Sequence, residues 1–119
     1  MDKEYVIYKH LKHLGIPASL QGFGYLLKGI ELVMDHPEYL RQITKMLYPE
    51  IARAFNTTAN RVERGIRHAT EVVFNNTDSA ILYEYFGNAT KTSSGKLTNS
   101  QFIAGIATYI NMEVYHDKH

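Results

Sequence analysis

Three arginines at three-residue spacing, Arg61, Arg64 and Arg67, are the residues of this chain whose pattern points most directly to chemistry. A guanidinium group is always charged and holds its N–H donors in one plane, which suits phosphate oxygens, carboxylates and the edges of nucleic-acid bases. On a helix with about 100° between residues, Asn60 and Glu63 lie on the same polar side. The opposite side is an apolar stripe of Val62, Ile66, Ala69 and Val73. The spacing predicts a surface helix, and the neighbouring segments decide what its polar face contacts.

The segment that contains these arginines fits a helix-turn-helix motif, "YPEIARAFNTTANRVERGIRH" over residues 48–68. The first helix of such a motif needs a small residue where the second helix crosses closely, and Ala52 fits. The turn needs a residue that tolerates positive φ, and Asn56 is suitable. Thr57 or Thr58 can cap the second helix. The expected shared core of the two helices is Ile51, Phe55, Val62 and Ile66.

In this motif the second helix, about residues 58–75, would lie in the major groove of DNA with its first exposed residues at base edges. Arg61 and Arg64 could then reach guanine O6/N7, Asn60 could contact adenine or a phosphate, and Glu63 could accept from cytosine N4. A second interpretation stays open, because Glu63 and Arg67 also form a favourable i,i+4 pair and Arg64 can simply be solvated. Phosphate contacts are expected from cationic and hydroxyl side chains of the motif and of the segment just before it: Lys45, Thr57, Thr58, Arg67 and His68.

Charge is concentrated in this part of the chain. The net charge of the whole chain is only +1. Between Arg41 and His68, however, six Lys or Arg residues stand against two Glu residues, which leaves a local excess of four positive charges. Because a charge gathered on one face matters more for DNA than the total charge, this local excess favours a nucleic-acid partner.

The 119 residues suffice for one domain, which we assign to residues 1–119. Hydrophobic residues make up 45% and charged residues 21%, as in ordinary globular proteins. The absence of cysteine excludes disulfides and thiolate chemistry. No apolar run approaches the ~20 residues of a membrane span, and the charged N-terminal segment does not fit a secretory signal. We therefore expect a cytoplasmic protein with no membrane partner.

Nearly every segment has helical periodicity, and no alternation typical of strands persists. We expect helices over residues 3–14, 20–35, 37–45, 49–55, 58–75 and 78–86, and a last helix from Thr98 through Ile110. The third of these should bury Leu40, Ile43 and Leu47. Asn88–Lys96 is a loop, and Thr98 with Gln101 is a capping-box signature. The predicted fold class is all-α, a compact bundle of about six helices containing a helix-turn-helix.

Other kinds of site find less support in the sequence. His10–His13 and His116–His119 have the spacing of paired metal ligands, but neither pair has a third ligand nearby. Asp35–His36 and Glu113–His116 are acid–base pairs on which nothing else converges. We therefore predict no metal, no cofactor and no enzyme activity.

Three segments carry a resemblance to a known family: "GIPASLQGFGYLLKGIELV", "ITKMLYPEIARAFNTTANRVERGIRHATEV" and "KLTNSQFIAGIA". They resemble the C-terminal DNA-binding effector domain of the sporulation response regulators, the stage 0 sporulation protein A family. The resemblance implies a six-helix fold around a helix-turn-helix. It also implies binding to a short G·C-containing box, often in tandem copies, upstream of sporulation and stationary-phase genes. The family's base-reading positions correspond to Arg61, Glu63 and Arg64, and a loop lysine that contacts phosphate corresponds to Lys96.

The chain also departs from the family pattern. Asn60 stands where the family usually has serine, and Gly65 stands where it has alanine, at a cost of about 1 kcal/mol in helix stability. The stretch Thr70–Thr90 keeps the family's length but little of its sequence. Relatives contact the RNA polymerase sigma subunit through this stretch, so the resemblance implies that partner less firmly than it implies DNA.

Two interpretations of the whole chain remain. The family's receiver domain is not among these 119 residues, so the chain is either part of a longer regulator or a stand-alone relative. As a regulator, it would bind double-stranded DNA as a tandem pair or homodimer. The alternative is a helical interaction module that modulates the full-length regulator by protein–protein contact, with some of its nine tyrosines on the partner surface.

Overall fold

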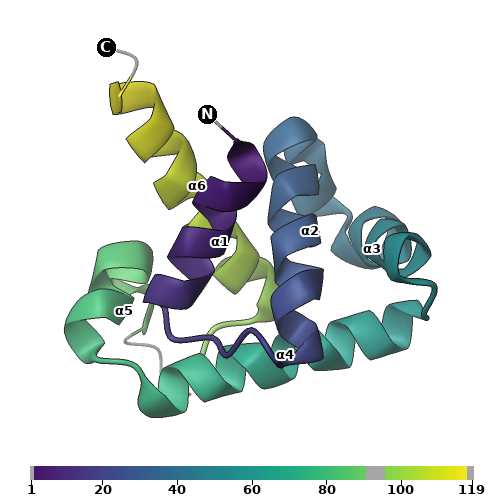
Figure 1. Cartoon of the computed structure of the whole chain (residues 1–119), viewed down its shortest axis with the longest axis horizontal. Helices are drawn as coiled ribbons and strands as arrows, with labels where there is room; N and C mark the ends of the chain where they lie inside the picture. The colour runs from purple at the N-terminus through teal and green to yellow at the C-terminus, as the bar shows by residue number, and fades with distance from the viewer. Residues whose placement is uncertain (1, 91–95, 118–119) are drawn as a thin grey trace.

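Six α-helices form the framework of the protein in a computed structural model that describes residues 2–90 and 96–117 (Figure 1). They are α1 (Lys3–His13), α2 (Gln21–Asp35), α3 (Tyr48–Phe55), α4 (Ala59–Asn76), α5 (Ser79–Phe86) and α6 (Asn99–Asp117). Three short helical segments join them: η1 (Pro37–Arg41), η2 (Ile43–Leu47) and η3 (Gly87–Thr90). The predicted all-α bundle is confirmed. Its radius of gyration of 13.5 Å is that of a compact chain of this length.

Local sequence explains where several helices begin and end. The Asp2 carboxylate accepts a hydrogen bond from the Glu4 amide at 3.0 Å and caps α1. Gly15, at φ 87°, lets the chain turn away after that helix. At α6, the amide of Gln101 donates to Thr98 Oγ1 at 3.1 Å and the amide of Thr98 donates to Gln101 Oε1 at 2.9 Å. These two bonds confirm the predicted capping box.

Helix α2 stands near the centre and packs against α1, α3, α4 and α6, while α4 runs along one edge of the molecule (Figure 1). The backbones of α2 and α4 cross very closely at two glycines. A Cβ atom on Gly22 would lie 2.2 Å from the Gly65 carbonyl oxygen, and one on Gly65 would lie 2.9 Å from the Tyr25 ring. Gly65 therefore lowers the helix propensity of α4, but its lack of a side chain allows α4 to approach α2 closely.

The predicted helix over residues 37–45 is wrong. The chain makes the 3₁₀ turn η1, breaks at Gln42 (φ −138°, ψ 49°), and then makes the wider π turn η2 that runs into α3. The break changes the direction of the chain, so that Leu47 is fully buried while Leu40 and Ile43 are half-buried. Of the three residues expected to point inward, only Leu47 is fully buried.

The other predicted segments are close to those observed. The predicted second helix of the motif, residues 58–75, is observed as α4, and the last helix begins next to Thr98 as expected. In the predicted loop Asn88–Lys96, the residues up to Thr90 complete η3, and residues 91–95 lie outside the described residues. In the described part of the chain, no helix combines the length and apolar content needed to cross a bilayer.

Candidate nucleic-acid interface

The turn between α3 and α4 has the geometry that a helix-turn-helix requires. Asn56 ends α3 in the left-handed region (φ 53°, ψ 51°), as the sequence predicted. The amide of Thr57 donates to the Ala52 carbonyl at 3.0 Å, which closes the end of α3. Thr58 Oγ1 then accepts from the Arg61 amide at 3.2 Å. Of the two threonines proposed as caps, Thr58 is therefore the one that caps α4.

The core between the two motif helices is formed by Ile51, Val62 and Ile66, each fully buried, with Ala52 at 6% exposure. The prediction that Phe55 joins this core is wrong, because its side chain is 45% exposed. Phe55 is the last residue of α3, and its ring lies edge-on to the Tyr25 ring of α2 at 5.2 Å between centroids. Phe55 therefore covers the N-terminal part of α2 rather than the space between α3 and α4.

The polar face of α4 is exposed as the helical periodicity predicted, and Val62, Ile66, Ala69 and Val73 are fully buried on the other side. Asn60, Arg61 and Arg64 project into solvent from the first two turns, and His68 follows one turn later. Among the described residues, neither Arg61 nor Arg64 has an acidic partner within ion-pair distance. Two guanidinium groups at the N-terminal end of α4, next to the capped turn, are thus available to contact a ligand.

Glu63 and Arg67 lie on the same polar face of α4, at its edge nearest the start of α6. They form the i,i+4 ion pair that the spacing allowed, with side-chain exposures of 28% and 58%. The Glu63 backbone carbonyl also accepts a hydrogen bond at 3.0 Å from Nδ2 of Asn99, the first residue of α6. This side of α4 therefore faces the start of α6, and the role of Glu63 at a base edge stays a prediction.

A groove of about 540 Å³ separates α4 from η2 and the start of α6. Two cations assigned to phosphate, Arg67 and Lys96, line it together with the buried ring of Tyr48. Each cation has a carboxylate of α4 nearby: Arg67 pairs with Glu63, and Lys96 Nζ lies 3.7 Å from Glu71. The Tyr48 phenol on the floor of this groove is uncharged at neutral pH, and burial raises its pKa further. The groove therefore has an uncharged floor at Tyr48. At its rim, the charges of Arg67 and Lys96 are balanced by the two carboxylates.

A second groove of about 560 Å³ adjoins the first one and shares Ile43, Thr44 and Ser100 with it. Lys45 and Arg41 line this second groove, and both are exposed. The structure thus brings Lys45 to the start of α6, near the segment that carries Lys96. Thr57 and Thr58 remain at the turn before α4.

Two residues of this region had no role assigned from the sequence. Arg41 was counted in the local excess of positive charge but was not assigned a contact, and it lines the second groove. Asn99 gave no signal, because its contact with the Glu63 carbonyl spans 36 positions of the chain.

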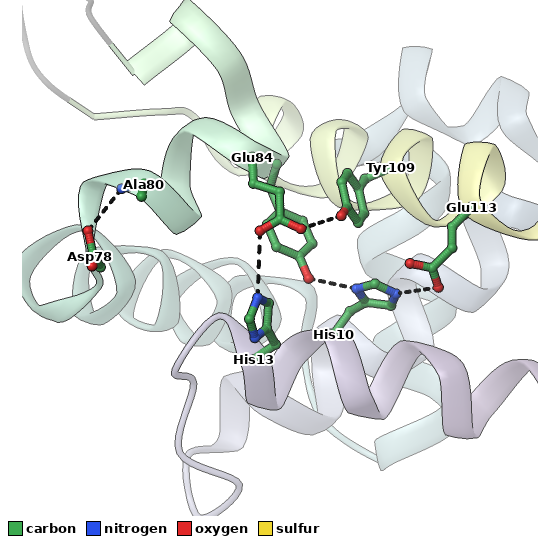
Figure 2. A network of polar contacts seen from close by, with 8 residues as sticks. His10, His13, Asp78, Ala80, Glu84, Tyr109 and Glu113 are labelled. Atoms are coloured by element: carbon green, nitrogen blue, oxygen red, sulfur yellow. Dashed lines mark hydrogen bonds and ion pairs between the residues drawn. The ribbon is translucent and has the colours of Figure 1, made fainter.

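A second polar cluster lies away from the motif, where α1, α5 and α6 meet (Figure 2). His10 Nδ1 lies 2.6 Å from the Tyr85 hydroxyl, and its Nε2 lies 3.2 Å from Glu113. The Tyr109 hydroxyl donates to Glu84, and this bond raises the pKa of Tyr109 to about 12. These partners cross-link three helices, so we interpret the cluster as a structural one.

The paired histidines considered as metal ligands do not converge. His10 faces Tyr85 and Glu113, whereas His13 Nε2 lies 3.7 Å from Glu84 (Figure 2). No group of three or more His, Cys, Asp or Glu side chains suited to a metal ion occurs within residues 2–90 and 96–117. The side chains of His116 and His119 lie outside the described part of the structure.

A left-handed turn between two packed helices, a capped second helix and an exposed arginine face define a helix-turn-helix domain. The sequence matches the family described as "Sporulation initiation factor Spo0A C terminal" over residues 7–110, nearly the whole chain. The chain belongs to this family. Its members are DNA-binding regulatory domains and not a catalytic family, so the protein is a DNA-binding regulator.

Proposed function

We propose that the protein is a sequence-specific reader of double-stranded DNA that regulates genes of the sporulation or stationary-phase type. The observation that carries this proposal is the pair Arg61 and Arg64. Both lie on the exposed face of α4 next to the capped turn, and neither has an acidic partner among the described residues. Such a helix end fits the major groove, where a guanidinium can donate two bonds to one guanine.

The proposed contacts divide by position on the fold. Base edges are assigned to the exposed side chains of the first turns of α4 and to the neighbouring carboxylate: Asn60, Arg61, Glu63 and Arg64. Phosphates are assigned to side chains that border the helix or the adjoining grooves: Lys45, Thr57, Thr58, Arg67, His68 and Lys96. To accept from cytosine N4, Glu63 must share or release Arg67, whereas Arg61 and Arg64 can approach DNA without breaking an ion pair of the described residues.

Two further partners belong to the proposal. Because one small domain buries little surface on DNA, a second copy on an adjacent box should raise the affinity. Contact with the RNA polymerase sigma subunit would involve the region of α5, and it rests on the family resemblance.

A second candidate function is a helical module that binds another protein. Tyr5 on α1, Tyr83 on α5 and Met112 on α6 are each more than half exposed, and all three lie outside the motif. Those side chains could contact a protein partner such as the full-length regulator.

Selection of bound duplexes from a pool of random double-stranded DNA separates the two functions. The DNA-reading function predicts that one short sequence is enriched; we refer to it as the selected duplex. In a gel shift, a shuffled duplex of the same composition should then bind much more weakly. If no sequence is enriched, while the protein co-purifies with a full-length regulator, the DNA-reading proposal is wrong and the module is favoured.

A further inference from the structure

Asn99 is the residue at which three parts of the DNA-binding region meet. It is the first residue of α6 and is half-buried at the edge of the groove beside α4. Its Nδ2 donates to the Glu63 backbone carbonyl on α4 at 3.0 Å and to the Tyr48 hydroxyl on α3 at 3.1 Å. One side-chain amide thus links α6 to both helices of the motif.

The position of the acceptor on α4 matters. Glu63 lies between Arg61 and Arg64, so the link from α6 reaches the backbone of the turn that presents both arginines. A carbonyl within a helix has a second lone pair available after its helical bond, so this contact costs α4 no bond of its own. Because the acceptor is main chain, the link also does not depend on which side chain occupies position 63.

Asn99 is equally close to the phosphate-binding segment. Lys96 precedes it by three residues, and the Thr98–Gln101 capping box fixes the chain between them at the start of α6. Lys96, Asn99 and Arg67 line the same groove. The bond to Glu63 therefore ties the start of α6, three residues after Lys96, to the turn of α4 that carries the arginines.

We propose that Asn99 is a positioning residue that sets the spacing between the base-reading face of α4 and the phosphate contact of Lys96. This inference rests on the proposed DNA-reading function. DNA bases and phosphates in one duplex are separated by fixed distances, so the two contacts can form together only if the protein holds them at the matching offset. Without Asn99, α4 can still read bases, but Lys96 is no longer held where it reaches the phosphate at the same time.

The test uses the full chain, the selected duplex and the shuffled duplex, with a double-mutant cycle between positions 99 and 96. Asn99→Ala should weaken binding to the selected duplex about tenfold or less, as expected for one lost hydrogen bond. Lys96→Ala should cost little more when added to Asn99→Ala. Arg61→Ala should keep its full effect on top of Asn99→Ala, because base reading by α4 itself is intact.

Matched controls separate this role from folding. Asn111→Ala makes the same change at an exposed position of the same helix and should leave binding unchanged. If Asn99→Ala unfolds, the isosteric Asn99→Asp removes the donor while favouring the start of a helix. Ser100→Asp then serves as its control, because it adds the same charge at the next residue. Asn99→Asp should bind the selected duplex more weakly than Ser100→Asp does.

The proposal is overturned if Asn99→Ala binds like Asn111→Ala, or if the effects of Asn99→Ala and Lys96→Ala multiply as independent changes. Equal binding by Asn99→Asp and Ser100→Asp would overturn it as well. Failure of the proposed function is a different result, because the wild-type protein would then enrich no sequence from the random pool.

Discussion

At the scale of single residues, the charged side chains of α4 differ in whether they already form an ion pair within the folded protein. Arg67 is held by Glu63, whereas Arg61 and Arg64 have no acidic partner among the described residues. A guanidinium without an ion pair can meet a base edge at the cost of its hydration alone, but a paired one must also exchange a carboxylate. This difference supports the proposal that Arg61 and Arg64 contact base edges, while Arg67 is assigned to a phosphate.

Gly65 tests how closely α4 approaches α2. Helix propensity alone predicts that Gly65→Ala gains about 1 kcal/mol. A Cβ atom would, however, lie 2.9 Å from the Tyr25 ring, which is 5% exposed, and forced overpacking of this kind typically costs about 1–3 kcal/mol. We expect no gain in the free energy of unfolding and a loss of up to about 2 kcal/mol, measured by urea denaturation.

Asn75→Ala is the control for Gly65→Ala, because Asn75 is exposed on the same helix and should follow propensity alone. If Gly65→Ala is stabilised by the full propensity difference, the close crossing of α2 and α4 is not present in solution.

At the scale of elements, the motif depends on the packing of α4 against α3 and α2. Ile66 is fully buried at this junction, so Ile66→Ala should lower the free energy of unfolding by about 2–5 kcal/mol. Arg64→Ala, one turn away from Arg67 on the exposed face, should change it by less than about 0.5 kcal/mol. Denaturant titration of both variants checks this pair. A change below about 1 kcal/mol for Ile66→Ala would mean that α4 is rotated from the orientation described.

Two tyrosines at the junction of α1, α5 and α6 should make the free energy of unfolding depend on pH in the alkaline range. The bond to Glu84 raises the pKa of Tyr109 to about 12, and burial raises the pKa of Tyr85 as well. An unfolded tyrosine titrates near pH ~10, so between pH ~10 and ~12 the unfolded chain loses a proton that the folded protein keeps. Stability should therefore fall as the pH rises through this window.

Tyr109→Phe should reduce this loss of stability, since the variant has no phenol to titrate at that position. Tyr83→Phe is the control, because Tyr83 is 56% exposed on α5. Urea denaturation at several values of pH measures both variants. Identical pH profiles for Tyr109→Phe and the wild-type protein would contradict the role assigned to the bond with Glu84.

Elements with strong local signals could be predicted from the sequence. The apolar stripe of α4, the left-handed Asn56 and the Thr98 capping box each depend on a few adjacent residues, and each is observed. The errors arose where tertiary packing decides. The chain breaks at Gln42 between η1 and η2, and Phe55 packs against Tyr25 of α2 instead of entering the core between α3 and α4. Asn99 could not be found, since its contacts join distant segments.

At the scale of the whole molecule, we expect a monomer in solution. The large hydrophobic side chains exposed in the described residues are Tyr5, Tyr8, Phe55, Tyr83 and Met112, which come from four helices. A stable dimer usually buries about 800 Å² on each partner, which needs a more continuous apolar surface. Sedimentation velocity should show a monomer without DNA and two copies on a duplex with two boxes. A stable dimer at micromolar concentration without DNA would contradict this expectation.

The central claim is that α4 reads bases while the segment before α6 anchors phosphate. The measurement that tests it most directly is the affinity of Arg61→Ala for the selected and shuffled duplexes at several salt concentrations. Arg61→Ala should cost about 1–3 kcal/mol on the selected duplex and almost nothing on the shuffled one. Lys96→Ala, measured alongside, should weaken both duplexes alike and flatten the salt dependence by about one unit of slope. If Arg61→Ala weakens both duplexes equally, Arg61 contacts only the DNA backbone, and α4 does not read sequence in the way described.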